Sequence, residues 1–137
     1  MINSRKIEDL HPIVADKCRK FIAKCEAQGI DILITSTYRD IESQNELYAQ
    51  GRTKPGKIVT KAKGGQSFHN WRVAFDFVPL LNGKPAWNDT ALFTRCGELG
   101  ESIGLEWAGR WVKFKELAHF QYTNGLKLSD FQNGKTL

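Results

Sequence analysis

The sequence predicts an α+β fold, with a small central antiparallel sheet flanked by helices. Three segments carry apolar residues at helical spacing, and short runs of β-branched and aromatic residues lie between them. Loops, rather than repeated βαβ units, connect most of these elements, which favours an antiparallel sheet. The 137 residues are 41% hydrophobic and 26% charged, so we expect one soluble domain over residues 1–137.

The first half of the chain supplies two helices and one strand. The first helix is expected over about residues 7–28, where apolar side chains recur at helical spacing up to Gly29. The run IDILITS follows it and is rich in β-branched residues, as strands are. Asp40 is a candidate N-cap for the second helix, IESQNELYAQ, which is expected to stop at Gly51. A loop without periodicity then extends to about residue 70.

The second half supplies most of the sheet. The run VAFDFV has the composition of a buried strand, and the Asn82-Gly83 pair after it is typical of a tight turn. A third helix is expected from a cap at Asn88 or Asp89 to Gly104. Short strands near LEW and HFQY complete the predicted core. No apolar stretch approaches the roughly 20 residues that cross a bilayer.

The N-terminal segment and the cysteines favour synthesis in a cytoplasm. The segment MINSRKIEDLHP is polar and charged, so a signal peptide is not expected. Cys18 and Cys25 are seven residues apart on the first helix, about 10.5 Å of rise, which is too far for a disulfide. No C-x-x-C pair is present for a structural zinc site. We therefore expect these two residues and Cys96 to be small buried thiols.

The formal net charge of +5 is concentrated in one loop. No acidic residue lies between Glu46 and Asp76, and the basic residues there are Arg52, Lys54, Lys57, Lys61, Lys63 and Arg72. Such a loop can contact nucleic acid, an anionic cell envelope or an acidic substrate, or it can be a solvated loop that serves only solubility. Aromatic residues do not alternate with these lysines, which argues against a stacking platform for nucleic acid.

The stretch QSFHNWRVAFDF places His69 and Asp76 seven positions apart. Alternate side chains of a strand share a face, so Asp76 is expected on one face and Phe75 and Phe77 on the other. A buried carboxylate needs a partner or a metal ion, because an isolated buried charge is costly. For this pair alone, a structural hydrogen bond is the simpler explanation.

The segment FKELAHFQY adds Glu116 and His119, three positions apart. Two histidines and one aspartate provide three ligands for Zn²⁺ and leave a fourth position for water. Glu116 is then available as the general base that takes a proton from that water. A structural zinc site would need a fourth protein ligand, and no cysteine is suitably placed. The pattern therefore indicates a catalytic site.

These motifs resemble those of the zinc D-Ala-D-Ala carboxypeptidase and L-Ala-D-Glu endopeptidase family. SFHNWRVAFD matches most of the motif S-x-H-x-x-G-x-A-x-D, and ELAHF matches the second motif, E-x-x-H-F. The flanks TYRDIESQNELYAQGRTKPG and LEWAGRWVKFKELAHFQ are similar to segments of the L-Ala-D-Glu endopeptidases of phage lysins. The likeness covers roughly residues 30–122, and it implies a hedgehog/DD-peptidase-like fold.

Carried over to this sequence, the resemblance implies a metal centre and a catalytic base. His69, Asp76 and His119 would bind one zinc ion per chain. Glu116 would be the base, where several lysin relatives carry aspartate, a change that keeps the chemistry.

The resemblance also implies residues that contact the substrate. Arg39 would lie over the scissile carbonyl and steady its developing charge, with a salt bridge to a neighbour such as Asp40 or Glu42 as the alternative. Ser67 would hydrogen-bond the substrate or a ligand. Trp111 would wall the cleft, as would Trp107, although large aromatic side chains fit a core equally well.

Two segments depart from the family pattern, in addition to the change at Glu116. The motif glycine is Arg72, and the usual Gly-Gly-Asp-Trp is replaced by Ala108-Gly109-Arg110-Trp111. If the strand begins by residue 72, alternation places Arg72 on the face of Asp76. From this we predict that Arg72 binds a D-Glu or diaminopimelate carboxylate of the stem peptide as a clamp. The alternative is a surface arginine bonded near Asp130.

The function that the resemblance implies is cleavage of the peptidoglycan stem peptide between L-Ala and D-Glu, by a monomeric phage-type endolysin. It would wait in the host cytoplasm until its release to the periplasm and cell wall, and the basic loop of residues 51–72 would bind the anionic envelope. The alternatives are a D-alanyl-D-alanine carboxypeptidase and a non-catalytic wall-binding module, against which the intact Glu116 argues. A His-Asn nuclease lacks its paired histidines here, so no nucleic acid partner is expected.

Overall fold

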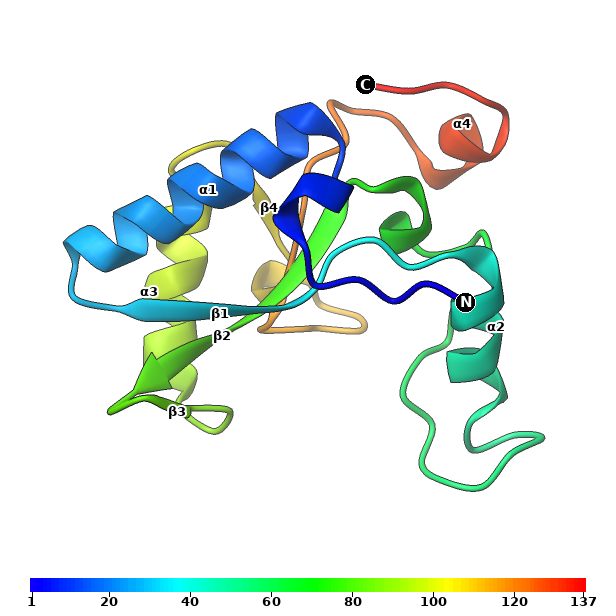
Figure 1. Ribbon diagram of the computed structural model, residues 1–137, viewed down its shortest axis with the longest axis horizontal. Helices are drawn as coiled ribbons and strands as arrows, with labels where there is room; N and C mark the ends of the chain where they lie inside the picture. The colour runs from blue at the N-terminus through cyan, green and yellow to red at the C-terminus, as the bar shows by residue number, and fades with distance from the viewer.

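One antiparallel sheet lies at the centre of the computed structural model, which describes residues 1–137. The strand order is β1-β2-β5-β4, and β3 pairs with β2 to form a hairpin. All pairings are antiparallel, which confirms the predicted α+β class (Figure 1). The strands are β1 Asp31–Ser36, β2 Ala74–Leu81, β3 Lys84–Pro85, β4 Glu106–Trp107 and β5 His119–Gln121.

Four α-helices and three short 3-10 helices surround the sheet. The α-helices are α1 Pro12–Ala27, α2 Ile41–Ala49, α3 Thr90–Glu101 and α4 Leu128–Gln132. The 3-10 helices are η1 Ile7–Asp9, η2 Phe68–Trp71 and η3 Ala108–Arg110. No helix combines the length and apolarity that crossing a bilayer requires.

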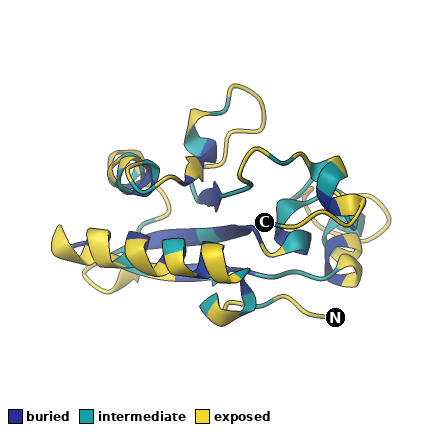
Figure 2. Ribbon diagram, turned by 90° about the horizontal axis from the view of Figure 1, so that it is seen from above, coloured by how far each residue is buried: buried dark blue, intermediate teal, exposed yellow.

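Helices α1 and α3 pack on the apolar face of the sheet. Phe21 of α1 contacts Phe75, Phe77 and Phe120, with ring centroids 4.7–6.1 Å apart, and Phe93 of α3 contacts Phe77 at 5.5 Å. All five rings are buried, and in Figure 2 the strands are dark blue next to α1, whose outer side is exposed. The predicted placement of Phe75 and Phe77 on a core face is therefore confirmed.

The predicted helix starts and turn are largely confirmed. The side chains of Asp40 and Asp89 accept hydrogen bonds from Ser43 N and Leu92 N, so both are N-caps. Asn82 and Gly83 have φ of 53° and 76° in the β2–β3 turn, the two positive values that a type I′ hairpin requires. The third helix ends at Glu101, three residues before the expected Gly104.

The expectation of one helix over residues 7–28 is wrong. The segment divides into η1 and α1, and His11 caps α1 by accepting a hydrogen bond from Ile13 N. Pro12 is the first residue of α1. A proline disfavours helical backbone in the residue before it, so the apolar periodicity continues across a break in the helix.

The three cysteines are buried and free, as predicted. Burial raises the pKa of Cys18 to about 12, so its thiol stays protonated at neutral pH. The basic residues lie in a long segment after α2 that projects away from the sheet (Figure 1). The apolar side chains Ile58 and Val59 of this segment are 55% and 56% exposed.

Candidate metal centre and active site

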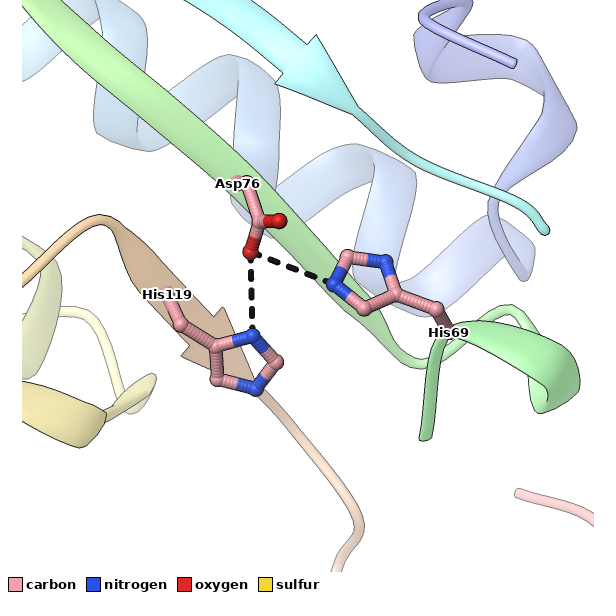
Figure 3. A group of neighbouring side chains, drawn as sticks. All are labelled: His69, Asp76 and His119. Carbon is pink, nitrogen blue, oxygen red and sulfur yellow. Dashed lines mark hydrogen bonds and ion pairs between the residues drawn. The ribbon is translucent and has the colours of Figure 1, made fainter. Parts of the chain in front are cut away.

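The register of the sheet places Asp76 and His119 side by side on the face opposite the phenylalanine core. Asp76 of β2 is paired with Ser36 of β1 on one side and with His119 of β5 on the other. In Figure 3, α1 lies behind β2, and the Asp76 side chain projects to the other side. Three neighbouring strands therefore contribute one polar residue each to a row across the sheet.

The short helix η2 brings His69 to this row. The Ser67 hydroxyl caps η2 by accepting a hydrogen bond from His69 N at 3.2 Å. The buried Asn70 side chain accepts from Gly65 N and donates to the Arg39 carbonyl, so it fastens η2 to the segment after β1. These bonds hold a helix too short to be stable by itself.

The three predicted ligands converge on one point. His69 Nε2 lies 3.1 Å and His119 Nδ1 lies 3.0 Å from the same oxygen, Asp76 Oδ1 (Figure 3). One ligand atom from each residue lies within 4.8 Å of the others, and both imidazoles are buried. Nitrogen and carboxylate donors at this spacing fit a zinc ion with three protein ligands.

Hydrogen bonds on the far side of each ring orient the imidazoles toward that point. His69 Nδ1 lies 2.8 Å from the Thr37 carbonyl oxygen, and His119 Nε2 lies 2.9 Å from Gln121 Oε1. Both partners are acceptors, so these nitrogens carry hydrogen and leave the lone pairs of His69 Nε2 and His119 Nδ1 for a metal. Metal-binding histidines are characteristically held in this way.

The electrostatics of the site keep Asp76 ionised. Burial acts to raise the pKa of Asp76, but the positive charge of His69 and the hydrogen bonds that both imidazoles donate when they are protonated outweigh burial and hold this pKa well below its ordinary range. Burial acts to lower the pKa of His119, but its bond to Asp76 outweighs burial and raises the pKa above the ordinary value. A cation between these groups is therefore favoured.

Glu116 lies at the edge of the metal centre. Its Oε2 is 3.8 Å from His119 Nδ1, and its side chain is 58% exposed. Glu116 lies between η3 and β5, three residues before His119, so the start of β5 fixes the position of both residues. A carboxylate that is solvated and adjacent to the ligand atoms is suited to exchange protons there.

Arg39 contacts Ser36, the β1 residue that is paired with Asp76, and it is not paired with Asp40 or Glu42, the alternative partners. Its guanidinium donates to Gln44 Oε1 at 3.0 Å and to Ser36 Oγ at 3.1 Å, while its buried Nε has no partner. Burial lowers the pKa of Arg39, and the charges of Asp76 and Glu116 partly oppose this. The half-buried cation therefore has a donor left for a further acceptor.

Trp107 and Trp111, the two tryptophans predicted to wall the cleft, have different environments. Trp111 lies next to the metal centre, with its ring 5.6 Å from that of His119, and its indole N–H donates to Glu106 Oε2. Trp107 belongs to the core, being 3% exposed, and its indole N–H donates to the Leu117 carbonyl. A Cβ at Gly97 would lie 2.3 Å from the Trp107 ring, so only glycine permits this packing.

The clamp predicted at Arg72 assumed that this residue lies on a strand, and this assumption is wrong. Strand β2 begins at Ala74, and Arg72 ends η2 with φ of 65°, so strand alternation does not apply to it. Its guanidinium donates to the Asp9 carbonyl oxygen at 2.7 Å and lies 3.7 Å from the Tyr38 ring centroid. The alternative, a bond near Asp130, is also not found. The positive φ explains why the family motif has glycine at this position.

Replacing Arg72 with glycine is expected to leave KM and zinc content unchanged and to alter stability by less than about 1 kcal/mol. The lost hydrogen bond and cation–π contact are worth roughly 1–2 kcal/mol together, and relief of the left-handed backbone returns a similar amount. Arg72→Ala is the control, because it loses the contacts without relieving the backbone. It should be ~1–2 kcal/mol less stable in thermal unfolding. A raised KM in both variants would instead support the hypothesis that Arg72 binds a substrate carboxylate.

Arg110, the other departure from the family pattern, makes a surface ion pair. Its guanidinium donates to both carboxylate oxygens of Glu101 at the end of α3. The pair fixes η3 against α3 and does not reach the metal centre.

Sequence reasoning missed four polar residues of the site, one of which is Glu106, the acceptor of the Trp111 indole N–H. Asn70 donates to the Arg39 carbonyl and so connects Arg39 to η2. Gln44 accepts from the Arg39 guanidinium and donates to the Ala62 carbonyl, so it connects Arg39 to the basic loop. Gln121 bonds to His119. Only Gln121 left a usable signal, because it follows His119 by two residues in a strand and so shares its face.

The fold and the site together define a class of protein, the metallopeptidases built on a small α+β domain. A family model, VanY, described as D-alanyl-D-alanine carboxypeptidase, matches residues 7–124. The chain therefore belongs to the VanY family.

One relative supports this membership, and two solved structures share the fold. The peptidoglycan L-alanyl-D-glutamate endopeptidase CwlK of Bacillus subtilis (strain 168) is 38% identical over 122 residues, and the match covers 82% of this chain and 73% of CwlK. The L-Ala D-Glu endopeptidase ChiX of Serratia marcescens has a similar fold, with a TM-score of 0.65 at 18% identity, over 91% of this chain and 86% of ChiX. A vancomycin resistance D,D-pentapeptidase VanY in complex with Zn(II) has a TM-score of 0.63 at 16% identity, over 90% and 84%.

Proposed function

We propose that this protein is a zinc peptidase that cuts the peptidoglycan stem peptide between L-Ala and D-Glu. The observation that carries the proposal is the convergence of His69 Nε2, Asp76 Oδ1 and His119 Nδ1, with both imidazoles fixed by acceptors behind them. The name of CwlK, the relative at 38% identity, supports the bond assignment.

The chain's own residues supply the rest of the chemistry. When bound, zinc acts as a Lewis acid toward the scissile carbonyl and the attacking water. Glu116 takes the proton of that water and gives it to the leaving amine nitrogen. Arg39, whose buried Nε has no partner, donates to the carbonyl oxygen as negative charge develops there.

The same proposal extends to the biological role. The protein acts as a monomeric phage-type endolysin that stays in the host cytoplasm until its release to the periplasm and cell wall. The resemblance of its flanking segments to phage lysins supports this role. The basic loop supplies affinity for the anionic envelope, and Lys61 of this loop lies 4.4 Å from the Phe114 ring, close in sequence to Glu116.

A D-alanyl-D-alanine carboxypeptidase is the second candidate function. The description of the matching family favours it, as does the similar fold of VanYB in complex with D-alanine-D-alanine, with a TM-score of 0.64. Both activities use the same groups at the metal centre. They differ in the bond that is presented to zinc and Glu116.

Hydrolysis of purified peptidoglycan tests whether the protein is an enzyme or a wall-binding module. The zinc-loaded protein should release new amino groups, and a chelator should stop this release until zinc is added back. A module that only binds would sediment with the wall material and release no amino groups, with or without zinc.

Zinc affinity is expected to rise with pH until the pH exceeds the pKa of His119, which lies above its ordinary value. The raised pKa of His119 means that zinc competes with a proton for Nδ1, and this competition disappears as pH rises above that pKa. Below it, the apparent affinity should fall by about tenfold per pH unit for the one displaced proton. Competition with a chromophoric chelator at several pH values measures this slope, and a pH-independent affinity would remove His119 from the ligand set.

A further inference from the structure

A chain of hydrogen bonds connects His119 to the indole of Trp111 through two other side chains. His119 Nε2 lies 2.9 Å from Gln121 Oε1, and Gln121 Nε2 donates to Glu106 Oε2 at 3.4 Å. The indole N–H of Trp111 donates to the same Glu106 oxygen at 3.0 Å. We call these four residues the Glu106 network.

The antiparallel register builds this network beside the metal centre. Gln121 follows His119 by two residues on β5, so both side chains lie on one face of the sheet. Glu106 of β4 is paired with Gln121, and on the other side Gln121 is paired with Ala74 of β2, whose small side chain leaves room. Gln121 is 5% exposed, so its amide must be satisfied within the protein, whereas Glu106 is solvent-exposed.

Glu106 sets the direction of every hydrogen bond in the network. An ionised carboxylate can only accept, and an indole N–H can only donate. Gln121 must therefore present its NH₂ group to Glu106 and its Oε1 to His119. This oxygen requires a hydrogen on His119 Nε2, so Nδ1, the atom 3.0 Å from Asp76 Oδ1, is the nitrogen whose lone pair becomes available when a metal ion displaces its proton.

We propose that Glu106 and Gln121 are positioning residues that fix the His119 tautomer needed to bind zinc through Nδ1. The same carboxylate holds Trp111 against the His119 ring, at a centroid distance of 5.6 Å. This inference rests on the proposed zinc function, since His119 is a ligand only in that function. Neither residue belongs to the proposed ligand set, and their hydrogen bonds reach it through His119, with Trp111 held by the same carboxylate.

The other metal-binding histidine provides an internal reference. His69 Nδ1 bonds to the Thr37 carbonyl, a backbone acceptor that no side-chain substitution removes. His119 instead depends entirely on side chains for its outer hydrogen bond. Changes at positions 106 and 121 should therefore alter the His119 ring and leave the His69 ring unchanged.

Two leucine variants test the network. Gln121→Leu removes the acceptor behind His119, and zinc affinity should fall by about 10- to 100-fold. Glu106→Leu frees the Gln121 amide to rotate and present its NH₂ group to His119, and the fall should be about tenfold. Competition with a chromophoric chelator measures affinity. Gln28→Leu, an exposed amide at the end of α1, is the matched control and should bind zinc as the wild type does.

A double variant with the two groups exchanged should restore binding. In Glu106→Gln combined with Gln121→Glu, the carboxylate at position 121 accepts from His119 Nε2 and from the amide at position 106. The amide oxygen at position 106 then accepts from Trp111. Every bond keeps a donor and an acceptor, so affinity close to wild type is expected. A role in packing alone would not give this recovery.

Nitrogen NMR of the imidazole rings reads the tautomer without any metal. Asp76 and Gln121 compete for the hydrogen of a neutral His119 ring, so a larger share of rings should carry it on Nε2 in the metal-free wild type than in Glu106→Leu. Wild-type zinc affinity and unchanged His119 resonances in Glu106→Leu would overturn the inference. Because Glu106 is exposed, this variant decides the question even if Gln121→Leu fails to fold. A wild-type protein that binds no zinc would instead contradict the proposed function, while the NMR comparison would still test the network.

Discussion

Replacing His119 with alanine is expected to abolish zinc binding and peptide hydrolysis together. The His119 ring is 7% exposed and supplies one of three converging ligand atoms, and Asp76 also loses a hydrogen bond. Two protein ligands hold zinc far more weakly than three, so purified variant protein should contain almost no metal. Elemental analysis and an amine-release assay on the same sample measure both losses.

His11 provides a matched control for this substitution. It is one of three histidines, and it caps α1 away from the metal centre by accepting from Ile13 N. His11→Ala should lose about 1 kcal/mol of stability through the missing cap and keep zinc and activity. If His119→Ala retained full zinc occupancy, His119 would not be a ligand.

Replacing Glu116 with glutamine is expected to lower kcat by about 10²- to 10⁴-fold while zinc and fold are retained. Glutamine has the same shape and can still hydrogen-bond water, but it cannot take a proton. Glu116 Oε2 is 3.8 Å from the nearest ligand nitrogen and its side chain is mostly exposed, so neither the metal nor the core depends on it. Steady-state kinetics, zinc analysis and thermal unfolding together separate these effects.

Glu101→Gln controls for the chemical change from carboxylate to amide. Glu101 pairs with Arg110 on the surface, and its variant should keep wild-type kcat. A Glu116→Gln protein with wild-type turnover would mean that another group takes the proton. A variant that lost zinc would make Glu116 a ligand.

The convergence of His69, Asp76 and His119 was predictable from the sequence because it depends partly on local rules. Alternation along VAFDFV placed Asp76 on the opposite face from Phe75 and Phe77. Asp40 and Asp89 were recognisable as N-caps because their side chains bond to backbone N–H groups within three residues. The resemblance of the two motifs to those of the family then predicted that His69 and His119 lie next to Asp76.

The rest of the site depends on contacts between distant segments. Arg72 was wrongly assigned to a strand. Its positive φ is set by the path of the backbone from η2 to β2, and no pattern in the sequence indicates that path. Glu106 was not recognised because its role follows from pairing with Gln121 across two strands that are only two and three residues long. Such short strands have no readable periodicity.

Mass spectrometry of the products from one defined muropeptide tests the central claim most directly. The substrate carries the complete stem peptide, with L-Ala joined to D-Glu at one end and D-Ala-D-Ala at the other. Zinc-loaded protein should produce a sugar fragment that ends in L-Ala and a free peptide that begins with D-Glu. Release of a single D-Ala with the L-Ala–D-Glu bond intact would contradict the account and identify a carboxypeptidase.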